Sequence, residues 1–160
     1  MQYKEFKQLL SEGTAAEVLF ISWIEKHGWT ARKTEPQDPA EPFDYMLYSN
    51  DTQKRKAVEI KSYGQPNLKT IFAETFQTGS KTIPEYLLYA DKIDYMIYVD
   101  QKNSFAFIYD MKSFVSYVKA NMNKEITIAR GSAKGIIIAE TCLDAGFKQK
   151  VFIGEADEKD

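Results

Sequence analysis

The 160-residue sequence is poor in the side chains that bind soft metals, with one cysteine, Cys142, and one histidine, His27. A single cysteine cannot form a disulfide within the chain, so we expect a reducing compartment. A zinc site of thiolates and imidazoles is excluded, because one ligand of each kind is too few for four-coordinate zinc. Any metal site must therefore use oxygen ligands, which favour magnesium, calcium or manganese.

Long apolar runs are also missing, and none approaches the roughly 18 to 20 residues that a membrane-spanning helix needs. Residues 1–13 are charged and lack the apolar region of a secretory signal, so we expect no membrane partner and a cytoplasmic location. The hydrophobic content of 44% and charged content of 28% are typical of a soluble globular protein. We expect one domain over residues 1–154 and an acidic, disordered tail over residues 155–160.

An excess of positive charge is lacking too, since the net charge is −2. The last six residues hold four acids and one base, so the rest of the chain is close to +1. A basic run, residues 54–56, lies beside the expected strand that carries Glu59. Charge alone leaves two interpretations of this run open, a solvated turn or a contact to nucleic acid.

Hydrophobic periodicity predicts a mixed α/β domain with a central sheet flanked by helices. Helical spacing is expected over residues 13–26, 84–92 and 111–122, with Gly28 as a left-handed cap of the first helix. Strands are expected over residues 29–34, 43–48, 56–62, 70–77, 95–99, 105–109, 126–129, 135–139 and 151–153.

Acidic residues occupy two strands of an expected hairpin, at Asp44 and Glu59. If the turn is centred between Asp51 and Thr52, Asp44 stands opposite Glu59, with Cα atoms about 4.5 to 5.5 Å apart. Like charges in that position are destabilising, and a divalent cation between them would explain the placement. Alternation along the strand puts Lys61 on the same face as Glu59. A slip of one residue in register would undo the pairing.

A third carboxylate, Glu17, lies inside the apolar arc of the first helix, about 60° around the axis from Phe20. A carboxylate there needs a partner. It either belongs to the same site as Asp44, or forms a capping box in which Glu17 bonds back to the amide of Thr14.

An acid in the first helix, Pro42-Phe43-Asp44 in one strand and Glu59-Ile60-Lys61 in the next resembles the PD-(D/E)XK nuclease superfamily. The resemblance covers roughly residues 14–62, and the proline lies one residue further from the acid than in the named motif. It implies a restriction-endonuclease-like fold and Mg²⁺-dependent hydrolysis of phosphodiester bonds in DNA, with Mn²⁺ as a substitute.

The resemblance also implies roles for individual residues. Asp44, Glu59 and the backbone carbonyl of Ile60 would bind metal, with Glu17 completing the shell directly or through water. Lys61 would position or help deprotonate the attacking water. The alternative for Lys61 is an ordinary ion pair near Glu59.

Other residues give weaker signals. Glu74 shares a strand face with Phe72 and Phe76 and would approach the site if that strand neighbours the hairpin, or else is a surface acid. Gln77 is similar to a glutamine that some exonuclease branches of the superfamily use. The remaining candidates are each matched by a structural alternative: Lys69 and Lys81 for phosphate contacts, Tyr86, Tyr89, Tyr95 and Tyr98 for base stacking or the core, and His27 for the end of a helix.

Small size and the family analogy predict a homodimeric endonuclease that acts on branched or recombination intermediates, like the resolvase-like or phage-type members. A restriction-type or exonuclease-like enzyme is the alternative within the same chemistry. The alternative of a different class is a non-catalytic member of the fold that binds nucleic acid or protein. Magnesium titration separates these classes, because only the enzyme needs the paired acids.

Overall fold

The structure is a computed structural model that describes residues 3–35, 38–63, 68–78, 81–128 and 133–154, with side chains from Thr14 onward. The acidic segment 155–160 and the end of the strand predicted over residues 126–129 lie outside the described residues. Among the described helices, none has the length and apolar character needed to cross a bilayer.

The chain alternates helices and strands, and strands predominate. The helices are α1 (Tyr3–Glu25), α2 (Glu85–Leu88) and α3 (Met111–Ala120), with short 3-10 turns η2 (Ala90–Lys92), η3 (Met122–Lys124) and η5 (Leu143–Ala145). The strands are β1 (Trp29–Lys33), β2 (Tyr45–Ser49), β3 (Arg55–Ser62), β4 (Thr70–Gln77), β5 (Tyr95–Asp100), β6 (Phe105–Asp110), β7 (Ile126–Ile128), β8 (Ala133–Ala139) and β9 (Phe147–Phe152). Every predicted strand is present, most of them within two residues of the expected bounds.

The first helix differs from the prediction, because α1 begins at Tyr3 rather than at residue 13. Gly13 costs about 1 kcal/mol in a helix interior, which is why it indicates a boundary in sequence patterns. Here the helix continues through it. Gly28 follows the helix with φ of 88°, the left-handed conformation that the sequence predicts.

The strands form two sheets instead of the single central sheet that the sequence predicts. The larger sheet has six strands in the order β1-β2-β3-β5-β6-β9, and the smaller has three in the order β4-β8-β7. Within the larger sheet β3 and β5 are parallel and the other neighbours are antiparallel. The chain between β3 and β5 makes the crossover that a parallel pair requires, and this crossover contains β4 and α2. The fold is therefore mixed α/β.

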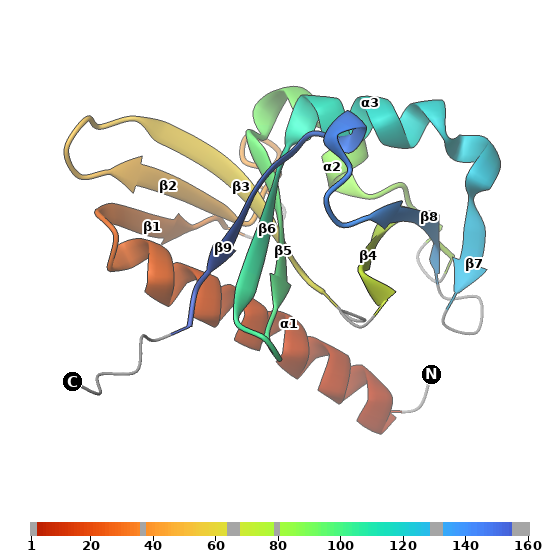
Figure 1. The fold of residues 1–160 in the computed structure, drawn as a ribbon, viewed down its shortest axis with the longest axis horizontal. Coiled ribbons are helices and arrows are strands. Elements are labelled where there is room, and N and C mark those ends of the chain that lie inside the picture. Colours follow the sequence, from red (N-terminus) through yellow and green to blue (C-terminus); the bar gives the residue numbers. More distant parts are fainter. Residues whose placement is uncertain (1–2, 36–37, 64–67, 79–80, 129–132, 155–160) are drawn as a thin grey trace.

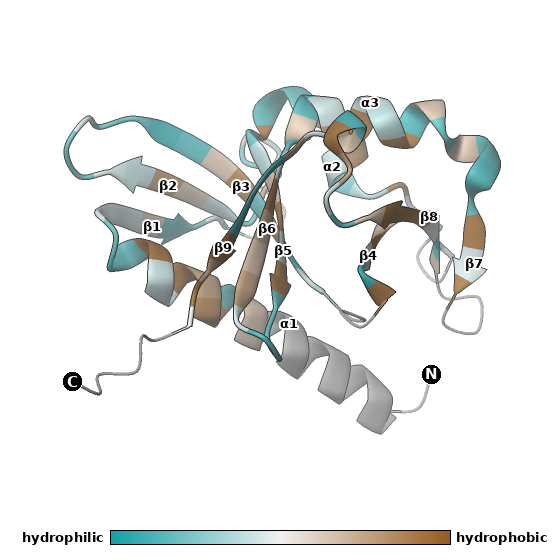
Figure 2. Ribbon diagram, viewed as in Figure 1, coloured by the Kyte–Doolittle hydropathy of each residue, from teal (hydrophilic) through white to brown (hydrophobic). Residues whose placement is uncertain are grey.

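Both faces of the six-stranded sheet are covered, and each has its own core. The α1-side core joins α1 to one face through residues such as Phe20, Val58 and Ile97. The inter-sheet core fills the space between the other face, α3 and the smaller sheet, through residues such as Tyr98 and Phe114. Figure 1 shows α1 below the larger sheet, α3 above it and β4, β7 and β8 to one side. The middle strands β5, β6 and β8 are largely hydrophobic, whereas the tip of the β2–β3 hairpin is hydrophilic (Figure 2).

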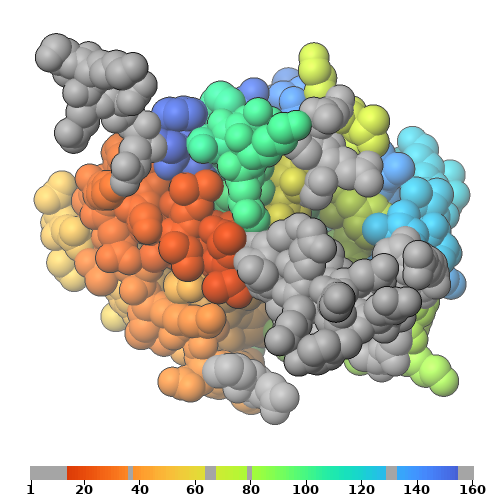
Figure 3. Space-filling model, turned by 90° about the horizontal axis from the view of Figure 1, so that it is seen from below, coloured from red at the N-terminus to blue at the C-terminus, as the bar shows by residue number. Residues whose placement is uncertain are grey.

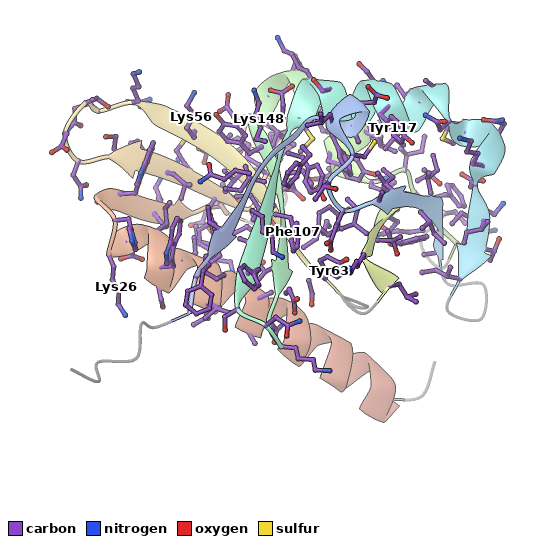
Figure 4. All side chains as sticks on the ribbon, viewed as in Figure 1. Lys26, Lys56, Tyr63, Phe107, Tyr117 and Lys148 are labelled. Atoms are coloured by element: carbon purple, nitrogen blue, oxygen red, sulfur yellow. The ribbon has the colours of Figure 1, made fainter. Side chains whose placement is uncertain are left out.

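Seen from below, the described part of α1 (orange) lies beside the turn that joins β5 to β6 (green), and the β7 region (cyan) lies at the opposite end (Figure 3). Between the two sheets, the rings of Tyr63 and Phe107 lie together with centroids 5.3 Å apart (Figure 4). Gly135 in β8 packs so closely on β4 that an added Cβ would lie 2.4 Å from the Phe72 ring. The smaller sheet is thus tightly packed.

Candidate functional site

The β2–β3 hairpin has the register that the sequence predicts. The regular ladder ends with Tyr45 opposite Val58, one pair before the predicted pairing of Asp44 with Glu59. Asp44 therefore directly precedes β2, whereas Glu59 lies within the adjacent strand β3. Asp44 and Glu59 do not form the direct backbone pair that we expected, and Asp44 makes other hydrogen bonds instead.

The main chain of Asp44 is held from both sides. Its N–H donates to the Val58 carbonyl at 3.1 Å, and its carbonyl accepts from the Thr34 N–H at 3.1 Å. The Asp44 side chain then replaces the missing ladder bond, because its Oδ2 accepts from the Ile60 N–H at 2.8 Å. Asp44 is thereby held between Thr34, the residue that follows β1, and strand β3.

Strand alternation places the charged residues of β3 on one face. Val58 and Ile60 belong to the α1-side core, so Glu59 and Lys61 face the inter-sheet side. The Glu59 side chain is only 9% exposed, whereas that of Lys61 is 41% exposed. The Lys61 Nζ lies 3.8 Å from Glu59 Oε2, which is an ion-pair distance. Asp44, Glu59 and Lys61 together line one cleft with a volume of about 720 Å³.

Burial strongly disfavours charge on the acid pair. Burial, together with the nearby Asp44 carboxylate, raises the pKa of Glu59 to about 8, while Lys61 opposes the shift. Burial also raises the pKa of Asp44, against the hydrogen bond from Ile60 and the charge of Lys61. The two carboxylates titrate together, and each disfavours ionisation of the other.

Glu17 approaches the acid pair from the α1 side and does not line the cleft. Burial and the charge of Asp44 raise the pKa of Glu17. Its carboxylate accepts a hydrogen bond from the Tyr45 hydroxyl, and its Oε2 lies 3.8 Å from Lys33 Nζ. The capping-box interpretation is wrong, because Thr14 lies inside α1 rather than at its start.

The other wall of the cleft comes from the end of β4, the segment that leads into α2, α2 itself and the residue after it. These contribute Gln77, Lys81, Ile83, Glu85, Leu88 and Tyr89. Tyr86 anchors this wall, since its hydroxyl donates to the Glu74 carbonyl and its ring packs 5.9 Å from that of Phe114. The wall is thus fixed to both β4 and α3.

Two weaker candidates, Glu74 and Gln77, prove to be neighbours. Glu74 is not brought to the cleft in the way we expected, because β4 pairs with β8 rather than with β3. It accepts from Gln77 Nε2 at 2.8 Å. Gln77 itself lines the cleft, and its backbone pairs with Thr82.

The remaining candidates lie in the cleft, in the core or nearer the surface. Lys81, Tyr86 and Tyr89 line the cleft, whereas Lys69 does not. Tyr98 is a core residue whose hydroxyl donates to the Phe72 carbonyl at 2.9 Å. Tyr95 is a half-buried sheet residue. His27 lies beside the Trp23 ring with centroids 4.5 Å apart and is hydrogen bonded to the Trp23 carbonyl.

Sequence analysis missed Glu85 and the two exposed apolar residues Ile83 and Leu88. The charge of Glu85 contributes to the raised pKa of Glu59, which places it within electrostatic range of the acid pair. Pro84 followed by Glu85 is a helix-start pattern that signals a carboxylate in a first turn. No local pattern shows that this turn faces β3.

Among the described residues, no three His, Cys, Asp or Glu side chains lie close enough together to hold a metal ion. The cleft presents the carboxylates of Asp44, Glu59 and Glu85, whereas Glu17 lies outside its lining. Comparison of the chain with family models, curated proteins and solved structures found no match in any of the three. Functional inference therefore starts from the chain's own residues.

Proposed function

We propose that this protein is a Mg²⁺-dependent nuclease of the PD-(D/E)XK type that hydrolyses phosphodiester bonds in DNA. The observation that carries the proposal is the shared cleft of Asp44, Glu59 and Lys61. Two carboxylates buried side by side are unfavourable unless a proton or a cation lies between them. The order of α1, β1, β2 and β3, with the acids in α1, before β2 and within β3, supports the family resemblance.

The donor set fits a hard divalent cation. Asp44 and Glu59 provide carboxylate oxygens, which magnesium and manganese prefer. The N–H and C=O of a strand residue point to the same side, and the Ile60 N–H bonds Asp44. The Ile60 carbonyl thus faces the same edge of β3, which supports its proposed role as a ligand. Glu17, on the other face, would act through water.

When bound, the cation supplies a lowered pKa for a coordinated water and positive charge near the scissile phosphate. The protein's own residues would orient the attacking water and neutralise negative charge on the phosphate. Lys61, held 3.8 Å from Glu59, would orient the attacking water and offset the negative charge of the transition state. The hydrogen bond from Ile60 would keep Asp44 in place throughout.

The direct test is incubation with supercoiled plasmid, linear duplex, single strand and a four-way junction, each with Mg²⁺ or EDTA. Cleavage should require Mg²⁺ or Mn²⁺, and Asp44→Asn, Glu59→Gln and Lys61→Met should each lower it by at least about 100-fold. Glu25→Gln, an exposed acid at the end of α1, is the matched control and should cleave normally. Cleavage in EDTA, or a fully active Lys61→Met, would refute the mechanism.

The non-catalytic alternative is a member of the same fold that binds nucleic acid or protein. It is favoured by the lack of a three-acid group among the described residues. Calorimetric titration separates the two, because the nuclease should bind Mg²⁺ and lose that binding in Asp44→Asn. Action on branched DNA as a homodimer stays part of the proposal, and junction cleavage with light scattering tests it.

A further inference from the structure

The wall of the cleft that faces the acid pair exposes large apolar side chains. Ile83 is 49% exposed and Leu88 is 56% exposed, while Pro84 and Tyr86 between them are buried. Both exposed residues line the same cleft as Asp44 and Glu59. The half-buried ring of Tyr89 continues this surface, which we call the apolar wall (Ile83, Leu88 and Tyr89).

The apolar wall is held in place by contacts within the folded chain. Tyr86, two residues before Leu88, is fixed by its hydrogen bond to Glu74 and by packing on Phe114. The Tyr89 ring lies under Lys92, whose Nζ is 5.6 Å from the ring centroid. Since this turn is anchored at its centre and at its end, exposure of the apolar groups is a property of the folded cleft.

A ligand in this cleft meets two different surfaces. One wall presents the Asp44 and Glu59 carboxylates and the Lys61 ammonium. The other presents aliphatic and aromatic groups together with the polar side chains of Gln77, Lys81 and Glu85. The cleft has the volume of a small-molecule site. A nucleotide unit matches both surfaces, because its phosphate suits a cation and Lys61 while the flat face of its base suits the apolar wall.

We propose that the apolar wall binds the face of an unpaired nucleobase next to the phosphate at the acid pair, so that the substrate is single-stranded or locally unpaired. This inference rests on the proposed nuclease function. In a continuous duplex the faces of the bases are covered by stacking, and only backbone and base edges would reach the wall. An unpaired base offers its face directly, which places Leu88 and Ile83 in contact with substrate.

The net charge of the cleft sets a condition on the binding of nucleic acid. The lining holds three acids, Asp44, Glu59 and Glu85, and two bases, Lys61 and Lys81, so with all five groups ionised it carries one net negative charge. One divalent cation reverses that sign. A strand of nucleic acid should therefore bind well only when the cation is present.

The experiment uses a single-stranded oligodeoxynucleotide about 12 nucleotides long with one 2-aminopurine, alone and annealed to its complement. Ca²⁺ replaces Mg²⁺ so that binding is measured without cleavage. The single strand should bind at least about 10-fold more tightly than the duplex, with 2-aminopurine fluorescence quenched by stacking. Leu88→Ser and Ile83→Ser should each weaken single-strand binding by about 5- to 50-fold, and Leu88→Phe should restore it.

The matched control is Leu143→Ser, because Leu143 is 77% exposed on η5 and does not line the cleft. It should bind like the wild type, and Mg²⁺ affinity should be unchanged in all four variants. Equal affinity for single strand and duplex, or no effect of Leu88→Ser, would overturn the inference. So would a Leu88→Ser variant that turns a dimer into a monomer with normal oligonucleotide binding.

Different results would refute the nuclease function and the base site at the apolar wall. If DNA is cleaved but duplex and single strand bind alike, the nuclease function stands and the apolar wall is not a base site. If the protein neither cleaves nor binds Mg²⁺, yet quenches 2-aminopurine in a Leu88-dependent way, the wall binds bases and the nuclease function is wrong.

Discussion

Glu59→Gln should stabilise the protein in the absence of metal while abolishing the proposed activity. Burial raises the pKa of Glu59 from 4.5 to about 8, so the folded state binds this proton more tightly than the unfolded state. The free energy of unfolding of the wild type should then fall as pH rises through this interval, and remain low above it. Glutamine keeps the shape of the side chain without its charge.

The magnitude follows from the pKa difference. At about 1.4 kcal/mol per tenfold change in proton affinity, the interval from 4.5 to about 8 gives an upper bound of ~5 kcal/mol. Part of the shift belongs to the coupled Asp44, and Lys61 at 3.8 Å favours the charged form. We therefore expect Glu59→Gln to raise the free energy of unfolding by about 2 kcal/mol near pH 9.

Magnesium should reverse the ranking. At a Mg²⁺ concentration about 100 times the dissociation constant, binding to the folded state adds ~2.7 kcal/mol to the wild type. Glu59→Gln lacks a ligand and should gain almost nothing. Urea denaturation from about pH 4 to 9, in EDTA and in Mg²⁺, measures both effects, with Glu25→Gln as the exposed control.

Two results would refute this reasoning. One is a Glu59→Gln variant that is less stable than the wild type at high pH in EDTA. Burial of the ionised Glu59 carboxylate would then not destabilise the folded state. The other is equal stabilisation of both proteins by Mg²⁺, because the cation would then bind elsewhere.

Further substitutions test the hydrogen bonds and packing that stabilise the fold around the site. Asp44→Ala should lower the free energy of unfolding by about 1 to 3 kcal/mol in urea, because the Ile60 N–H loses its acceptor, whereas Asp44→Asn should lower it less. Gly135→Ala should destabilise the protein by about 2 kcal/mol or more in thermal melts, because its Cβ would lie 2.4 Å from the Phe72 ring; an unchanged melting temperature would contradict this packing. Asp110→Ala should cost about 1 kcal/mol, since Asp110 caps α3, and its loss should be visible as reduced helical circular dichroism.

Local patterns predicted the elements around the site because each depends on nearby residues. The register of the β2–β3 hairpin follows from its turn and from alternation along Arg55–Ser62. The position of β4 did not follow, because pairing with β8 joins segments more than fifty residues apart. The start of α1 was missed because an intrinsic penalty at Gly13 is outweighed in the folded helix.

The sequence by itself determined that any metal here must bind oxygen, because the chain holds one cysteine and one histidine. The hairpin register that it predicts also brings Asp44, just before β2, close to Glu59 in β3. Only the tertiary structure decided which other residues lie near Asp44 and Glu59. The crossover from β3 to β5 brings Glu85 and the apolar wall opposite the acid pair, whereas α1 brings Glu17 to the other face of the sheet. Strand periodicity fixes which face a side chain takes, but the partner across a cleft depends on long-range packing that no local pattern records.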